Sequence, residues 1–146
     1  SLSAYGVGFH RHNSEIEQMI KKYSKHKLDL TFTPHLSPMF RGIFSTIYVD
    51  LKNGKTISNL HNELVKYYKH SPFVKVQKQN SLISTNDVIG TNKCKITVCK
   101  SKYKNKAILL SCIDNLIKGG AGQAIQNMNI LYNFNVKEGL KWKKLF

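Results

Sequence analysis

Hydrophobic and polar residues alternate in several short stretches of the chain, a pattern typical of strands that bury one face. A first, shorter strand is expected near the start, where it runs into a loop punctuated by Gly6 and Gly8. Strands 95–99 and 107–112 are joined by a lysine-rich turn, which predicts an antiparallel hairpin. The full set of later strands predicted by the alternation is 28–33, 43–51, 73–76, 95–99 and 107–112.

Three other stretches carry apolar residues at helical spacing. The first begins near Asn13 or Ser14, because either can cap a helix and Glu17 completes a capping box with Ser14. The second is capped by Thr56 or Ser58 and ends before Pro72. The buried face expected for the first helix is Ile16, Met19, Ile20 and Tyr23.

The third helix follows a strand, an Asp114-Asn115 pair and a cluster of glycines between 119 and 122. Ala124, Ile125 and Met128 then recur at helical spacing. Backbone N–H groups in such a turn can approach an anionic or amide-bearing ligand, although glycines before a helix also simply permit a tight turn.

The order of these elements predicts an α+β fold. Consecutive strands follow one another as in hairpins, so we expect a mostly antiparallel mixed sheet with helices on one face. The chain of 146 residues has the size of one compact domain and shows no internal repeat or low-complexity segment.

The net charge of +15 suggests nucleic acid as a binding partner. However, the lysines are spread along the whole chain, and its only arginines are Arg11 and Arg41. A protein that binds nucleic acid usually has more arginines, because the guanidinium group forms paired hydrogen bonds with phosphate and guanine. A lysine-biased solvated surface is therefore the preferred interpretation. A positive field would also attract small phosphorylated substrates.

The three cysteines, Cys94, Cys99 and Cys112, are an odd number with no C-x-x-C pair. This argues against disulfides and against a zinc site, and it suits a reducing, cytoplasmic setting. Each lies in or beside an apolar strand, so no catalytic nucleophile is visible. No apolar run has membrane-spanning length, and a start at Ser1 without a leader sequence predicts a piece of a longer protein.

Two short polar motifs are candidates for chemistry. His10-Arg11-His12 precedes the first helix, and a helix N-terminus with a neighbouring cation favours a neutral imidazole, the state that a general base needs. Arg41 stands at the seam between a loop and a strand, beside Gly42, which would let a ligand or another backbone come close.

Together these stretches resemble the C-terminal portion of the N-acetyl-gamma-glutamyl-phosphate reductase family, which is related to aspartate-semialdehyde and glyceraldehyde-3-phosphate dehydrogenases. The resemblance covers nearly the whole chain. It departs from the family at Asn13-Ser14, where Thr-Pro is usual, and at Gly120, where alanine is common. The matching motifs are His10-Arg11-His12 before Glu15-Ile16-Glu17-Gln18, Phe32-Thr33-Pro34-His35-Leu36 with Pro38-Met39, Arg41-Gly42-Ile43, Val88-Ile89-Gly90-Thr91-Asn92, and the stretch 113–130.

The resemblance implies a reductase of two parts, of which this chain holds the later one. Residues 1–112 would form a substrate-binding and dimerisation domain, and residues 113–146 a helix and tail that pack on an N-terminal NADP-binding domain. That other domain would supply most of the NADP site and a nucleophilic cysteine. The cysteine displaces phosphate from N-acetyl-glutamyl 5-phosphate, and hydride from NADPH reduces the thioester to the semialdehyde. The chain alone is expected to be inactive.

The resemblance also assigns roles to individual residues. His10 matches the family's catalytic acid/base. Tyr5, Arg11, His12 and Arg41 are the predicted substrate contacts, with the arginines holding carboxylate or phosphate. Asn115 is expected to bind the nicotinamide amide, and Gln123 is a weaker cofactor contact. The expected partners are an acyl phosphate and further copies of the chain, as a dimer or tetramer, with no metal, membrane or nucleic acid.

Three alternatives remain. An aspartate-semialdehyde-type dehydrogenase fragment is disfavoured by the early position of the His-Arg-His motif. A basic α+β domain that binds nucleic acid would show an affinity that falls steeply with added salt. The isolated piece could also serve purely as a dimerisation module.

Overall fold

The structure is a computed structural model that describes residues 1–24 and 29–140. The chain forms two compact units, Ser1–Phe40 and Arg41–Phe146. None of the helices formed by the described residues combines the length and the apolar character needed to cross a membrane.

The first unit contains a two-stranded sheet and one helix. Strand β1 (Ser3–Ala4) pairs antiparallel with β2 (His35–Leu36). The predicted strand 28–33 is wrong for its described part, since residue 28 lies outside the described residues and 29–34 form no strand. A strand can extend only as far as a neighbouring strand pairs with it. The neighbour β1 is short, because the chain turns at Gly6, where φ is +55°.

Helix α1 (Arg11–Tyr23) begins earlier than the sequence predicts. Its N-cap is His10, whose ring nitrogen Nδ1 accepts the His12 backbone N–H at 3.2 Å, so a cap at Asn13 or Ser14 is wrong. The predicted buried face is also wrong for Met19 and Tyr23, which are 53% and 77% exposed. The exposure of Met19 and Tyr23 follows from a small unit that has little apolar interior to offer.

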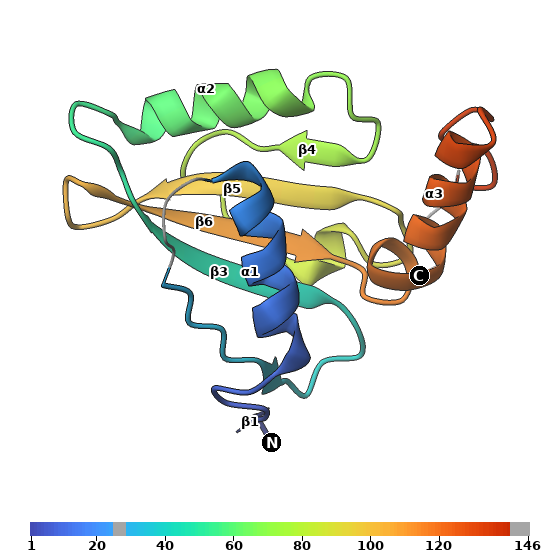
Figure 1. Cartoon of the computed structure of the whole chain (residues 1–146), viewed down its shortest axis with the longest axis horizontal. Helices are drawn as coiled ribbons and strands as arrows, with labels where there is room; N and C mark the ends of the chain where they lie inside the picture. Colours follow the sequence, from blue (N-terminus) through green and yellow to red (C-terminus); the bar gives the residue numbers. More distant parts are fainter. Residues whose placement is uncertain (25–28, 141–146) are drawn as a thin grey trace. The chain divides into compact units, whose positions relative to one another are not determined.

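The second unit is built on a four-stranded sheet in the order β3-β6-β5-β4 (Figure 1). Strands β3 (Ile43–Asp50), β6 (Lys106–Ile113) and β5 (Cys94–Lys100) are antiparallel neighbours, which confirms the predicted hairpin. Strand β4 (Val74–Val76) runs parallel to β5 at the edge. The sheet is therefore mixed and mostly antiparallel, which confirms the predicted α+β class.

Helix α2 (Ile57–Tyr68) packs against β4 and β5. Its cap is the predicted Thr56, whose hydroxyl accepts the Asn59 N–H while the Asn59 side chain accepts the Thr56 N–H. A 3₁₀ turn (Thr85–Asp87) leads into the small core where Ile83, Val88 and Cys112 are buried together.

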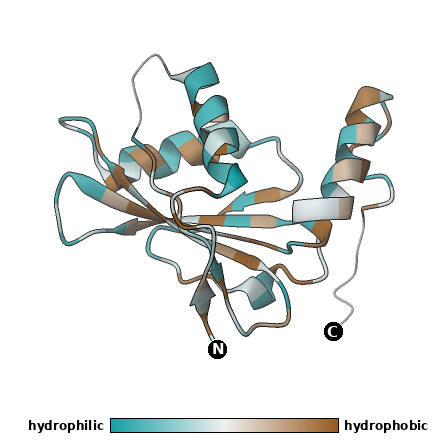
Figure 2. Ribbon diagram, turned by 60° about the horizontal axis from the view of Figure 1, so that its bottom comes forward, coloured by the Kyte–Doolittle hydropathy of each residue, from teal (hydrophilic) through white to brown (hydrophobic). Residues whose placement is uncertain are grey.

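Beyond β6 the chain makes a single π-helical turn (Ile117–Ala121) and enters α3 (Gly122–Leu131), the predicted third helix. Gly122 and Asn129 are its buried residues. Figure 2 shows hydrophobic residues recurring along α3, and many of them are exposed. Met128, Ile130 and Leu131 are 46%, 58% and 74% exposed, so the helix keeps an apolar surface available for a partner.

Candidate functional site

The first unit holds His10 inside a cluster of aromatic rings. Tyr5 lies edge-on with its ring centroid 5.3 Å from that of His10, His12 at 4.7 Å and Phe32 at 5.5 Å. Three rings around one imidazole restrict its rotation, so His10 is half-buried in a defined orientation. The structure thus brings together the predicted residues Tyr5, His10 and His12.

Gly6 makes room for the His10 ring. A Cβ atom at position 6 would lie 3.0 Å from Cδ2 and 3.1 Å from Cβ of His10, and the backbone φ of +55° suits glycine. Any larger residue would therefore push against the imidazole.

The two other members of the motif lie in the first turn of α1 and are more open. Arg11 is exposed. The His12 side chain is 45% exposed, and its Nε2 lies 3.9 Å from the Glu15 carboxylate. Both are accessible to a ligand in this unit.

In the second unit a buried carboxylate gathers four donors. Asp114 is 0% exposed. Its Oδ1 accepts hydrogen bonds from Arg41 Nη2 at 2.8 Å and from the backbone N–H groups of Leu116 and Ile117 at 2.9 and 3.0 Å. Its Oδ2 accepts the Gly90 N–H at 2.8 Å. We call Asp114 with these four partners the Asp114 hub.

The protonation of Asp114 follows from two opposing causes. Burial raises the pKa of the carboxyl, but the Arg41 guanidinium and the backbone N–H donors outweigh it and hold the pKa below its ordinary value. Asp114 is therefore an anion that ties the start of β3 to the turn after β6. Arg41, a predicted substrate contact, is 16% exposed and has one nitrogen bound to this carboxylate.

Asn115 lies beside the hub and offers a donor. Its Oδ1 accepts the Gly42 N–H at 2.7 Å. The side-chain Nδ2 has no hydrogen-bond partner among the described residues, so it can donate to the carbonyl oxygen of a ligand. The space at Gly42 is filled by the Thr85 side chain, 2.8 Å from where a Cβ would stand, and not by a ligand.

Gln123 is engaged at both ends. Its Oε1 accepts from Lys118 Nζ at 2.7 Å, and its Nε2 donates to Asn127 at 2.8 Å. Lys118 also donates to Gln126 at 2.8 Å, which in turn accepts from the buried Asn92. Burial lowers the pKa of Lys118. Gln123 thus anchors the start of α3, and a cofactor would have to displace these bonds.

The environment of Cys112 disfavours its thiolate form. Burial raises the pKa of the Cys112 thiol, with Asp87 and Cys94 adding to the effect, and its Sγ donates to the Ser84 carbonyl at 3.3 Å. Within residues 1–24 and 29–140, no three His, Cys, Asp or Glu side chains are grouped closely enough to hold a metal ion.

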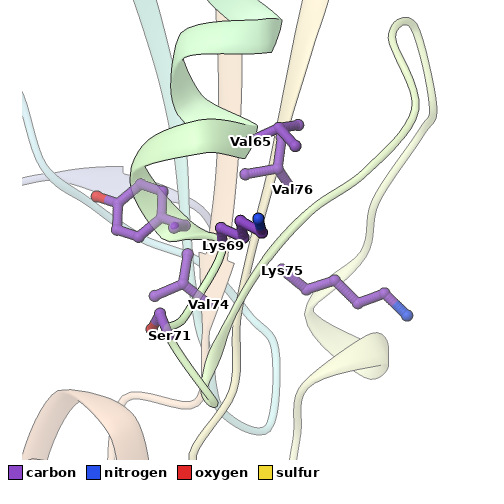
Figure 3. A pocket seen from close by; sticks show the side chains of 7 residues that line it. Val65, Lys69, Ser71, Val74, Lys75 and Val76 are labelled. Atoms are coloured by element: carbon purple, nitrogen blue, oxygen red, sulfur yellow. The ribbon is translucent and has the colours of Figure 1, made fainter.

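A shallow cleft of about 190 Å³ lies between the end of α2 and β4 (Figure 3). Val65 and Val76 form its apolar wall, and Tyr68 and Lys69 are among its polar residues. Burial raises the pKa of Tyr68, helped by Tyr67 and Cys94. None of the predicted site residues lines this cleft.

Sequence reasoning missed Gly6 and Phe32 as the supports of His10, and Asp114 as the centre of a hub. Their signals were present: Phe32 belongs to a family motif, and Asp114 stands between an apolar strand and a glycine cluster. The partners of Asp114 are 73 and 24 residues away at Arg41 and Gly90, so no local pattern connects them.

Comparison with known proteins identifies the class. Residues 1–115 match the family described as "Semialdehyde dehydrogenase, dimerisation domain", and the chain belongs to this family. Two relatives named N-acetyl-gamma-glutamyl-phosphate reductase, from Staphylococcus aureus strains MRSA252 and USA300, are 45% and 44% identical over all 146 residues. The chain spans 43% of the length of these relatives.

The fold also resembles a solved structure, aspartate semialdehyde dehydrogenase II from Vibrio cholerae. The match has a TM-score of 0.52 and 16% sequence identity over 68% of this chain and 29% of that chain. At this identity the likeness concerns the fold alone.

Proposed function

We propose that this chain is the substrate-binding and dimerisation part of an NADPH-dependent reductase. The enzyme converts N-acetyl-glutamyl 5-phosphate to N-acetyl-glutamate 5-semialdehyde and phosphate, as a step of arginine biosynthesis in the cytoplasm. The names of the relatives, which match all 146 residues, support this substrate. The observation that carries the proposal is the ring cluster that holds His10 in one orientation within the family-matched residues.

His10 is the residue of this chain that handles the reacting acyl group. The rings of Tyr5 and His12 contact it. Arg11 follows it in the chain, and the exposed Arg11 guanidinium suits a carboxylate or phosphate of the substrate. The nucleophilic cysteine comes from a part of the enzyme outside these 146 residues. Arg41 is the least favoured of the substrate contacts, because its guanidinium is already bound to Asp114.

A nicotinamide dinucleotide supplies the hydride for this reaction. Asn115 fits such a ligand, since its free Nδ2 can donate to the carboxamide oxygen while Gly42 holds its other end. Gln123 fits less well, because both ends of its side chain are bound within the protein. The preference for NADP over NAD belongs to the proposal.

We expect the enzyme to be a homo-oligomer. The family description names a dimerisation domain, and the edge strand β3 exposes apolar side chains that a second copy could cover. Phe44 is 41% exposed, Ile47 45% and Tyr48 74%. A dimer or a tetramer fits these observations.

The test is turnover by a protein of the relatives' full length that carries this 146-residue sequence. With NADPH and N-acetyl-glutamyl 5-phosphate it should release phosphate and oxidise one NADPH for each semialdehyde formed. Aspartyl 4-phosphate is the control substrate, and equal or faster turnover of it would favour the aspartate-semialdehyde alternative. The 146-residue chain alone should show no turnover, and substantial activity there would contradict the proposal.

A further inference from the structure

At one end of the four-stranded sheet, the fold gathers lysines that are far apart in the sequence. Strand β3 ends at Asp50 opposite Lys106, the first residue of β6, and the hairpin between β5 and β6 closes at the same end (Figure 1). The Leu51 backbone N–H donates to the Asn105 carbonyl oxygen at 2.7 Å, which ties the segment after β3 to this hairpin. We call the lysines of the two segments the basic end: Lys52, Lys55, Lys100, Lys102, Lys104 and Lys106.

The basic end has little compensating negative charge. Residues 50–55 and 100–106 contain a single acidic residue, Asp50, whose carboxylate is bound to Lys106 at 2.6 Å. The other lysines of the basic end are exposed, and none of them forms an ion pair with a residue in 1–24 or 29–140. Positive charge concentrated in this way attracts a ligand with several negative charges.

Local hydrogen bonds hold the backbone that carries these lysines. The Lys55 N–H donates to the Lys52 carbonyl oxygen at 2.9 Å and closes one turn. In the hairpin, the Lys106 N–H donates to the Tyr103 carbonyl oxygen at 3.2 Å, and the Tyr103 N–H donates to Ser101 Oγ at 3.2 Å. The charges therefore stand on two folded turns, so a ligand need not order the backbone when it binds.

Tyr103 places an aromatic ring among these charges. It is 55% exposed, and Lys102 Nζ lies 4.9 Å from its ring centroid. It is the one exposed large hydrophobic side chain of residues 50–55 and 100–106, all of which the structure describes. An anionic membrane surface would call for several apolar side chains that enter the bilayer. An exposed ring beside lysines instead suits the bases and phosphates of a single strand of nucleic acid.

We propose that the basic end binds single-stranded nucleic acid, with lysines contacting the phosphates and a base stacking on Tyr103. Lysine contacts phosphate as a point charge, and the chain's two arginines lie outside both segments, so the binding has no sequence preference. The sequence argument against nucleic acid depends on lysines spread along the chain. It does not apply to segments that the pairing of β3 with β6 brings together.

The test is fluorescence anisotropy with a labelled oligouridine of about twelve nucleotides and a protein of the relatives' full length that carries this sequence. The affinity should fall steeply as potassium chloride is raised from about 50 to about 200 mM. No binding of the oligonucleotide at low salt would overturn the proposal. Binding that appears only with phosphatidylglycerol vesicles would overturn it as well.

A fourfold lysine-to-glutamine variant of the basic end tests the location, and a second fourfold variant with the same change in charge is its control. The basic-end variant should bind about tenfold or more weakly, and its salt slope should drop by about 0.7 for each lost phosphate contact. The control should change the affinity far less. Equal weakening in both would show that binding follows net charge alone and would overturn the proposal. The basic-end variant replaces Lys52, Lys55, Lys102 and Lys104, and the control replaces the exposed Lys66, Lys69, Lys75 and Lys93.

Tyr103 tests the stacking. Tyr103→Ala should weaken binding about fivefold or more, because a stacked base loses its contact, whereas Tyr103→Phe should keep the affinity. An unchanged affinity of Tyr103→Ala would contradict the proposal. None of the substituted residues belongs to the His10 cluster or the Asp114 hub, so circular dichroism and turnover should match the unmodified protein. The binding result is therefore separate from the success of the proposed function.

Discussion

The His10 cluster and the Asp114 hub both combine charged or ionisable side chains with a helix start. They differ in how many of their polar atoms are hydrogen-bonded within the protein. In the hub, four donors are used on one buried carboxylate. In the His10 cluster, one ring nitrogen caps a helix and the ring is packed by Tyr5 and Phe32, which leaves Nε2 for a ligand. A polar network whose donors and acceptors are all bonded to one another stabilises a fold. A network that leaves one oriented polar atom for a ligand can take part in chemistry.

This difference changes the interpretation of Arg41. As one of only two arginines within family motifs, it is predicted to hold substrate. Its bond to the buried Asp114 carboxylate instead favours a structural role over a substrate contact. The comparison therefore predicts large stability effects in the hub and large rate effects at His10.

The largest stability effect is expected from Asp114→Ala. The variant leaves the mostly buried Arg41 guanidinium without its carboxylate, and removing one partner of a buried ion pair costs about 3–5 kcal/mol. Urea unfolding followed by circular dichroism measures this loss.

The matched control is Asp50→Ala, which removes the ion pair of Asp50 with Lys106. These side chains are 72% and 45% exposed, so the free energy of unfolding should change by no more than about 1 kcal/mol. Equal losses in the two variants would mean that the Asp114 hub does not act as a buried network.

The hub should also give stability a pH dependence. The pKa of Asp114 in the folded protein lies below its unfolded value of about 3.9. Its contribution is therefore fully present above the unfolded value and is lost as the pH falls through the folded value. The stability advantage over Asp114→Asn should be constant above about pH 5 and shrink below about pH 4. An advantage that grows on acidification would show that the pKa is raised.

A smaller effect separates ring packing from backbone strain in the His10 cluster. Gly6 and Gly8 both have positive φ, +55° and +80°, but a Cβ at Gly8 meets nothing within 4 Å. Alanine at either position should cost about 1–2 kcal/mol through backbone strain. Only Gly6→Ala should also shift the NMR signals of the His10 ring. Identical spectra for the two variants would show that Gly6 does not support the imidazole.

The sequence could predict those features that depend on neighbours along the chain. The alternation predicted β3, β5 and β6, and the hydroxyl of Thr56 identified the start of α2. The start of α1 was missed because the usual capping rules look for a side-chain oxygen, while His10 caps with a ring nitrogen. The parallel pairing of β4 and the Asp114 hub depend on residues far apart in the chain, and periodicity carries no information on them.

We propose that the chemistry of this chain resides on His10 and that the Arg41–Asp114 pair holds the fold. The most direct test is kcat of His10→Ala and Asp114→Asn in the full-length protein, at a temperature where both remain folded. We expect kcat to fall by a factor of about 10²–10⁴ in His10→Ala and by a much smaller factor in Asp114→Asn. An unchanged kcat for His10→Ala, or the larger loss at Asp114, would contradict it.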